Sequence, residues 1–354
     1  MTERLRASIE RWPKTELHLH LDGSLLVETA LELARSRGVD APGGITEMRS
    51  ALVAPERCGS QAELLRAFDL PIVLLQDAEA LERVTRELVE VKAIDGVSYV
   101  EIRWGPLLHT ARGLALDAGI AAVCAGAEAG AGAAAAAGRP IEVRLIATAL
   151  RSHEPAANLR LAEAAAGFRD RGLVGWDLAG PEEQYPDPLP HRSSCEAARA
   201  GGLRITLHAG EWGGPAQVRQ ALALDPERIA HGSPAIEDDG LCQLLIERGV
   251  ALDLCPTSNV QAGIVSSLEE HPLARLHRRG VPVTLSTDDL TVSDVTLTEE
   301  YARAVERIGL TPAEMWTIDR GALDRAFADD ATLSRLRAEF DAWAIGEPGL
   351  ATQA

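Results

Sequence analysis

The sequence predicts an α/β protein folded as a closed (β/α)8 barrel, or TIM barrel, with a helical cap inserted after the first strand. Two observations support this prediction. Short β-branched runs alternate with longer stretches of Ala, Leu, Glu and Arg, which is typical of parallel strands joined by crossover helices. Eight such runs occur, and several, including ALDL and VTLS, are apolar on both faces, as expected of strands packed between a core and a layer of helices.

The eight predicted strands follow one another in chain order. They span residues 15–19, 97–103, 141–147, 173–178, 203–207, 228–230, 250–254 and 281–285. The gap between the first two is too long for one crossover and contains helical patterns such as AELLRAFDLPIVLL, so we expect the cap at about residues 24–95. An Ala-rich segment at 111–138 falls where the second crossover helix is due, and we expect a surface helix there.

Three further helical patterns follow the eighth predicted strand. They are EEYARAVERIGLT, TPAEMWTIDRGALDRAF and DDATLSRLRAEFDAWA. The tail at about 346–354 is expected to fray. No internal linker marks a second domain, and a length of 354 residues suits one large barrel with insertions, so we expect a single domain over residues 1–354.

The chain is acidic, with a formal net charge of −18. Binding to nucleic acid or to an anionic membrane surface gains from positive charge, so neither kind of partner is expected. The five cysteines are odd in number and form no C-x-x-C pair, which favours reduced thiols and a cytoplasmic location. The most apolar stretch, 119–138, is mostly Ala and Gly and carries a Glu, so we expect no membrane-spanning helix. The expected partner is a small molecule, and the oligomeric state is left open.

The first predicted strand ends in ELHLHLDGS, which places two histidines two residues apart. Side chains alternate along a strand, so His18 and His20 project to the same face. At the carboxyl end of a barrel strand, two such imidazoles are arranged to share one metal ion. By itself the H-x-H pattern is weak evidence, because two half-buried histidines bonded to backbone carbonyls would give the same sequence.

Other predicted strand ends carry matching groups. His208 and Glu211 follow the fifth strand in TLHAGEWG, His231 ends the sixth in RIAHGS, and Asp288 and Asp289 follow the eighth in VTLSTDDL. Singly, Glu211 or Asp289 could be a residue that caps a helix, but barrel enzymes place their catalytic groups at this face. Three neutral imidazoles and one carboxylate make a zinc set with a position open for water, and such a site lowers the pKa of that water toward about 7. Neither of the only two lysines lies at the end of the fourth strand, so we expect one metal ion.

Taken together, the motifs PKTELHLHLDGSL, LAGPEE, HAGE, RIAHG, CPTSN and STDD resemble, in order, the motif set of the adenosine deaminases. The resemblance covers nearly the whole chain. It implies one Zn2+ per chain, and the residues that would hold the ion are His18, His20, His208 and Asp288. The same resemblance implies a purine substrate, because the family replaces the 6-amino group of the purine with oxygen.

The resemblance also assigns a role to each remaining site residue. For the reaction itself, it implies that Glu211 protonates the purine at N1, that His231 orients and deprotonates the attacking water, and that Asp288 is catalytic as well as a ligand. For the purine ring, it implies that Asp289 partners N7 and that Gly180 contacts N3. For the rest of the pocket, it implies that His20 and Asp22 lie near the ribose hydroxyls and that Leu65 and Phe68 belong to the helix that closes the pocket. Proton donation to N1 suits the chemistry, because attack at C6 builds negative charge there. Gly180 could equally be needed only for its turn conformation.

The expected function is zinc-dependent hydrolysis of adenosine and 2′-deoxyadenosine to inosine products. Adenine, or a 5′-modified adenosine such as aminodeoxyfutalosine, is an alternative substrate with the same mechanism. A metal-assisted hydrolase of amides or phosphoesters and a catalytically inactive nucleoside-binding barrel are the alternatives of other classes. Away from the motifs, we expect Cys255 to be buried and the other histidines to lie at the surface, and these are His109, His153, His191, His271 and His277.

Overall fold

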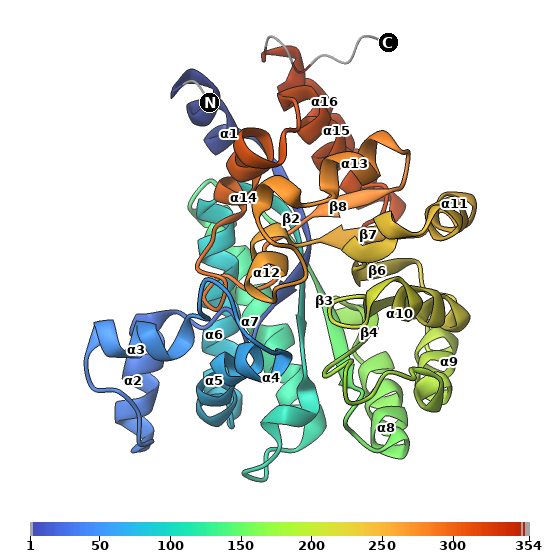
Figure 1. Cartoon of the computed structure of the whole chain (residues 1–354). Helices are drawn as coiled ribbons and strands as arrows, with labels where there is room; N and C mark the ends of the chain where they lie inside the picture. The colour runs from blue at the N-terminus through green and yellow to red at the C-terminus, as the bar shows by residue number, and fades with distance from the viewer. Residues whose placement is uncertain (1–2, 348–349, 351–354) are drawn as a thin grey trace.

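The computed structural model describes residues 3–347 and 350. Eight parallel strands, each paired with the next along the chain, curve into a barrel surrounded by helices (Figure 1). The strands are β1 (Lys14–His20), β2 (Val97–Trp104), β3 (Glu142–Leu150), β4 (Leu173–Ala179), β5 (Arg204–Ala209), β6 (Arg228–His231), β7 (Ala251–Leu254) and β8 (Val283–Leu285). All eight predicted strands are confirmed, with small differences at their ends.

The barrel closes between its first and last strands, just beyond the end of β8. Leu19 and Asp288 form a parallel bridge. The backbone N–H of His20 donates to the carbonyl of Asp288 at 2.7 Å, and the N–H of Asp288 donates to the carbonyl of His18 at 3.1 Å. The closure of the barrel therefore fixes the two histidines of β1 beside Asp288.

The predicted cap segment contains five α-helices, and they differ in where they pack. They are α2 (Val27–Arg37), α3 (Ile45–Leu52), α4 (Gln61–Leu65), α5 (Asp69–Leu74) and α6 (Ala78–Ile94). In Figure 1, α2 and α3 project away from the barrel, whereas α4 and α5 lie against it. Helix α6 packs along β2 and α7 and so occupies the place of an ordinary outer barrel helix.

Helix α7 (Leu116–Ala136) is the Ala-rich segment, and half of its most apolar stretch is buried inside the protein. It is the one described helix that is long and apolar enough to cross a membrane. A Cβ on Gly126 would lie 2.3 Å from the carbonyl oxygen of Glu82, and one on Gly130 would lie 2.7 Å from Cβ of Val89. The small residues therefore allow α7 to pack closely on α6, which accounts for its composition more fully than the surface helix that we expected.

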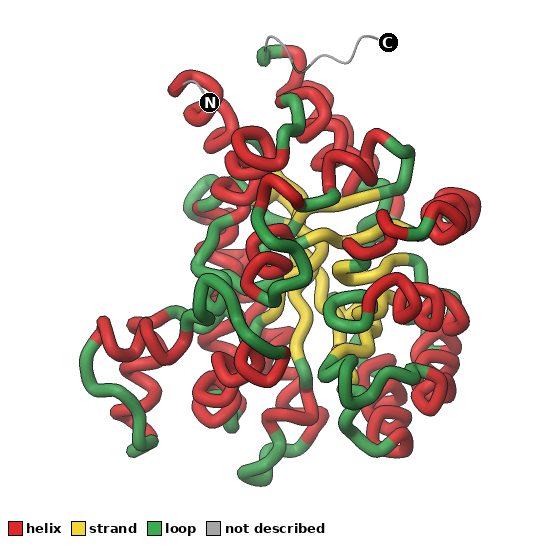
Figure 2. The backbone as a smooth tube through the Cα atoms, viewed as in Figure 1, coloured by secondary structure: helices red, strands yellow, loops and turns green. Residues whose placement is uncertain are grey.

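The remaining helices complete the outer layer, which Figure 2 shows in red around the yellow strands. They are α1 (Glu3–Arg11), α8 (Pro155–Ala166), α9 (Arg192–Ala200), α10 (Gly214–Ala221), α11 (Asp239–Arg248), α12 (Pro256–Gln261), α13 (Leu273–Arg278), α14 (Leu297–Arg303), α15 (Pro312–Ala322) and α16 (Asp330–Ile345). The last three are the helices predicted after the eighth strand. Most of the tail expected to fray, 346–354, lies outside the described residues.

Candidate active site

A cavity of about 340 Å³ opens at the carboxyl ends of the barrel strands. This volume lies near the lower end of the range for small-molecule sites, roughly 300–1,000 Å³. Its wall includes every predicted site residue except His18, namely His20, Asp22, Leu65, Phe68, Gly180, His208, Glu211, His231, Asp288 and Asp289. His18 is fully buried beside them, within 2.9 Å of Asp288.

The four predicted metal ligands come together at one point of this cavity. Nε2 of His20 lies 3.3 Å from Nε2 of His18 and 3.2 Å from Nε2 of His208. Oδ1 of Asp288 lies 2.9 Å from Nε2 of His18 and 3.5 Å from Nε2 of His20. Nitrogen ligands at about 2.0–2.1 Å from a tetrahedral zinc ion lie about 3.3 Å from one another, so the spacing of these atoms fits one such ion.

The charge state of the imidazoles also suits a metal ion. Burial lowers the pKa of His18 well below its ordinary value and lowers that of His208 in the same direction. Both rings are therefore neutral at pH 7, and a neutral imidazole offers the lone pair that a metal needs.

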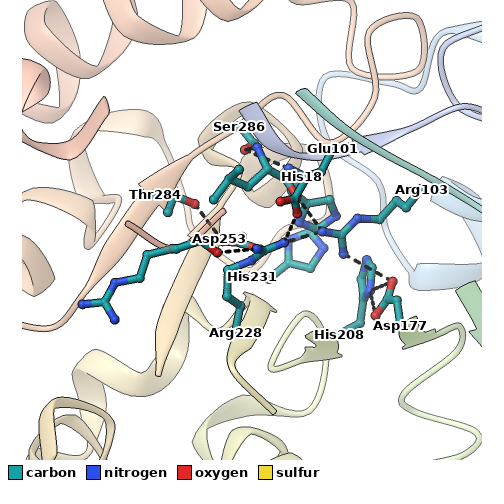
Figure 3. Close-up of polar contacts among 12 residues, drawn as sticks. His18, Glu101, Arg103, Asp177, His208, Arg228, His231, Asp253, Thr284 and Ser286 are labelled. Carbon is teal, nitrogen blue, oxygen red and sulfur yellow. Dashed lines mark hydrogen bonds and ion pairs between the residues drawn. The ribbon is translucent and has the colours of Figure 1, made fainter. Parts of the chain in front are cut away.

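A second layer of side chains orients this cluster. Nδ1 of His208 donates to Oδ2 of Asp177 at 2.9 Å, which leaves Nε2 free to face the metal position. Figure 3 shows this pair, with the guanidinium of Arg103 beside the same carboxylate. On the other side, Oγ of Ser258 donates to Oδ2 of Asp288 at 2.6 Å. Sequence reasoning missed Asp177 and Ser258, although Ser258 lies inside the CPTSN motif.

Glu211 lies in the loop after β5 and lines the same cavity, with its Oε1 3.9 Å from Nε2 of His231. Glu182 holds this loop, because its carboxylate accepts backbone N–H bonds from Gly210 at 2.8 Å and from Trp212 at 2.8 Å. Burial, with the charges of Asp288 and Glu182, raises the pKa of Glu211 well above its usual range. This shift favours the protonated form of Glu211, which is the form that can donate a proton.

Asp289 and Asp22 present free oxygens to the cavity. Oδ1 of Asp289 and Oδ1 of Asp22 are buried without a hydrogen-bond partner. Burial and the charge of Asp288 raise the pKa of Asp289 well above its usual range, which favours the protonated form that can donate a hydrogen bond. The other oxygen of Asp22 accepts from the N–H of Gly105 at 3.1 Å. The bond from Gly105 holds Asp22 in place, and both side chains have an oxygen available for a polar group of a ligand.

Three residues at the cavity have left-handed backbone conformations. Gly180 has φ of 107°, which confirms the turn, and it also lines the cavity. His231 has φ of 63° and Asp288 has φ of 68°. Such a conformation costs a non-glycine residue roughly 1–3 kcal/mol, and residues held in this way cluster at active sites.

Three of the histidines that we expected at the surface are buried, and that expectation was wrong for them. His109 lies 3.9 Å from Asp22, His191 faces the carbonyl of Arg151, and His271 faces Asn259. His153 and His277 are half-buried. Cys255 is buried as predicted, and all five cysteines are free.

Comparison with known proteins shows which family has a sequence like this one. Residues 13–343 match the model of the adenosine deaminase family. The chain is similar to a protein named adenosine deaminase from Mycolicibacterium vanbaalenii, with 40% identity over 338 residues that cover 90% of this chain and 91% of the relative.

Two solved structures have the same fold. The N6-mAMP deaminase of Arabidopsis is 31% identical, with a TM-score of 0.83 over 95% of this chain and 99% of that one. An amidohydrolase from Burkholderia ambifaria with bound zinc is 25% identical, with a TM-score of 0.87 over 98% of this chain and 95% of that one.

Proposed function

The chain belongs to the adenosine deaminase family, and we propose that it converts adenosine and 2′-deoxyadenosine to inosine products with one zinc ion per chain. Hydrolytic deamination of a 6-aminopurine is the activity of this family and of this chain. The observation that carries the finer proposal is the convergence of His18, His20, His208 and Asp288 beside one cavity that Glu211, a carboxyl group with a raised pKa, also lines.

Zinc is the metal that this donor set suits best. Three imidazole nitrogens and one carboxylate oxygen, at the spacing found here, are typical zinc ligands. The bound zinc in the related amidohydrolase from Burkholderia ambifaria supports the same metal. When bound, the ion would activate water at neutral pH and stabilise negative charge on the attacking oxygen.

Side chains of the protein supply the remaining functions, which are proton donation and orientation of the purine. We assign to Glu211 the donation of its proton to N1 as the water oxygen bonds to C6, so that no negative charge is left on the ring. We assign to Asp289, in the protonated form that its raised pKa favours, a hydrogen bond to N7 that fixes the plane of the purine. The proton released by the attacking water then passes to N6, the C6–N6 bond breaks and ammonia leaves. The remaining hydroxyl proton returns to Glu211 as the 6-oxo group forms.

The walls of the cavity favour a nucleoside over a nucleotide. Among the described residues that line the cavity there is no Lys or Arg, but the acidic side chains of Asp22 and Asp69 line it. A 5′-phosphate would meet these carboxylates without a cation to pair with, which disfavours binding. The related Arabidopsis enzyme is named for a nucleotide substrate, so this is the point at which we expect the two proteins to differ.

The cap supports a substrate larger than free adenine. Leu64, Leu65 and Phe68 line the cavity and supply an apolar cover that excludes water from the reacting atoms. The unpartnered oxygen of Asp22 is available for a hydroxyl of the sugar. We place His20 beside the same hydroxyls, because its Nδ1 lies 3.7 Å from Asp22.

We propose in addition that the chain forms a single barrel domain with its cap at about 24–95, and that it works in the cytoplasm. One main hydrophobic cluster extends through the described barrel and its helices, which supports a single domain. The five free cysteines support a reducing compartment.

A substrate panel tests the proposed function. Ammonia release is measured with adenosine, 2′-deoxyadenosine, AMP, adenine, aminodeoxyfutalosine and, as a negative control, cytidine. We expect the highest kcat/KM with the two nucleosides and at least a hundredfold lower value with AMP. A higher kcat/KM with AMP, adenine or aminodeoxyfutalosine would replace the proposed substrate. Tight adenosine binding without ammonia release would identify an inactive nucleoside-binding protein.

A further inference from the structure

A line of buried polar groups runs from the backbone of α13 to the ring of His231. The N–H of Leu273 donates to Nδ1 of His271 at 3.2 Å. Nε2 of His271 lies 3.1 Å from Oδ1 of Asn259, and Nδ2 of Asn259 lies 3.1 Å from Nδ1 of His231. The three side chains are fully or almost fully buried, so water does not compete for these bonds.

The direction of every hydrogen bond in this line follows from its first member. A backbone N–H can only donate, so Nδ1 of His271 must accept, and the proton of this neutral ring is on Nε2. Burial lowers the pKa of His271 to about 3, which keeps the ring neutral at pH 7. The His271 Nε2–H then donates to Oδ1 of Asn259, and this turns the amide NH2 of Asn259 toward His231.

The same reasoning fixes the hydrogen on His231. Its Nδ1 accepts a hydrogen bond from the Nδ2–H of Asn259 and therefore carries no hydrogen, so the neutral ring carries its hydrogen on Nε2. Nε2 of His231 points into the cavity, 3.9 Å from Oε1 of Glu211 and 3.9 Å from Oδ2 of Asp288.

We propose that Asn259 and His271 are positioning residues that hold His231 as a hydrogen-bond donor toward the attacking water. This inference rests on the proposed function. In this tautomer His231 has no free lone pair at Nε2, so it orients the water but does not receive its proton. That differs from the role that the family resemblance implied for His231. The proton released as the water oxygen bonds to C6 passes instead to the carboxylate of Asp288, because Glu211 gives its own proton to N1 in the same step.

The protein contains two internal references for the test. Nε2 of His191 faces the carbonyl oxygen of Arg151 at 3.2 Å, so this ring also carries its hydrogen on Nε2. Its Nδ1 lies 3.0 Å from Nδ2 of Asn158, which repeats the His231–Asn259 arrangement outside the cavity. His208 has the opposite tautomer, because its Nδ1–H donates to Asp177.

The first experiment is a nitrogen NMR spectrum of the zinc-loaded protein with 15N-labelled histidine. The signals of His231 and His191 are assigned by their loss in single His→Gln variants, which leave the four metal ligands intact. We expect His231 to show a protonated Nε2 and an unprotonated Nδ1, as His191 does. A His231 pattern with a protonated Nδ1, as in His208, would overturn the proposal. The spectrum needs no substrate, so it remains decisive even if adenosine proves not to be the substrate.

The second experiment uses Asn259→Asp to reverse the direction of the hydrogen bond between residue 259 and His231. A carboxylate can only accept, so it draws the His231 hydrogen to Nδ1 and leaves a lone pair on Nε2. We expect the His231 NMR pattern to reverse and kcat to fall by roughly 10²–10³-fold, the usual loss when one donor to a developing charge is removed, with KM and zinc content nearly unchanged. If His231 were instead the base, Asn259→Asp would retain or raise kcat, and the proposal would fail.

A third experiment uses two variants of His271 and still tests the proposal if Asn259→Asp does not fold. His271→Gln retains an N–H that can donate to Asn259, whereas His271→Leu removes it at similar volume. We expect kcat to stay within about threefold of the parent value in His271→Gln and to fall at least tenfold in His271→Leu. Equal kcat in the two variants, with both folded and zinc-loaded, would contradict a positioning role.

Discussion

Gly23 lies in the HLDGS motif, and the structure predicts that adding one methyl group there damages substrate binding. A Cβ at this position would lie 1.6 Å from Oδ1 of Asp289 and 2.9 Å from Cε1 of Phe68. The first distance is far below any tolerated contact, so the carboxyl group of Asp289 must move. Gly23→Ala therefore acts through the group that we assign to N7 of the purine, although it removes no functional atom.

The size of the effect follows from the bond that is lost. A buried hydrogen-bonding group deprived of its partner costs about 1–3 kcal/mol. Since 1.4 kcal/mol corresponds to tenfold, we expect kcat/KM for adenosine to fall roughly 5- to 150-fold. The assay is the initial rate of ammonia release over a range of adenosine concentrations, with zinc content measured on the same sample.

Two controls make the result specific. Gly132→Ala, on the exposed side of α7, places its methyl where no atom lies within 4 Å, and we expect unchanged kcat/KM. In the Asp289→Ala background, Gly23→Ala should cost much less than in the parent protein, because the two changes remove the same interaction. A Gly23→Ala variant with the parent kcat/KM, or full additivity with Asp289→Ala, would refute the reasoning.

Three further predictions concern proton donation, the cap and stability. Glu211→Gln should lower kcat by roughly 10²–10⁴-fold with zinc content unchanged, because the amide cannot protonate N1. The rate of ammonia release measures this loss, and a kcat near the parent value would contradict the role of Glu211 as proton donor. Phe68→Ala should raise KM for adenosine about tenfold or more through lost apolar contact with the ligand, while an unchanged KM would remove Phe68 from the pocket lid. Burial raises the pKa of Asp319 to about 7 from 3.8, so the folded protein holds a proton that the unfolded chain has lost, and stability falls as pH rises through this window. Asp319→Asn should flatten that fall in Tm between pH 4 and 7, and an unchanged slope would contradict the assignment.

The barrel and the metal position could be predicted from sequence because each leaves a local signal. Alternating β-branched runs mark the strands, and a barrel gathers the residues at their carboxyl ends whatever their separation in the chain. His18 and Asp288 are far apart in sequence, yet the closing bridge beside Leu19 places them in contact.

The residues that sequence reasoning missed act through contacts between distant segments. His271 lies in a polar stretch and was expected at the surface, but α12 covers it through Asn259. A single histidine has no periodicity, so its burial depends wholly on which segments pack over it. Asp177 is similar, since an acid inside a strand becomes a partner for His208 only once β4 and β5 lie side by side.

The central claim is that one zinc ion at this cluster supports deamination of adenosine by this chain. The most direct measurement is a zinc titration of the metal-free protein, with bound zinc, ammonia and inosine determined at each point. We predict that activity rises in proportion to bound zinc, saturates at one ion per chain, and yields one inosine for each ammonia. Full activity without metal, or no inosine from adenosine at one bound zinc per chain, would contradict the claim.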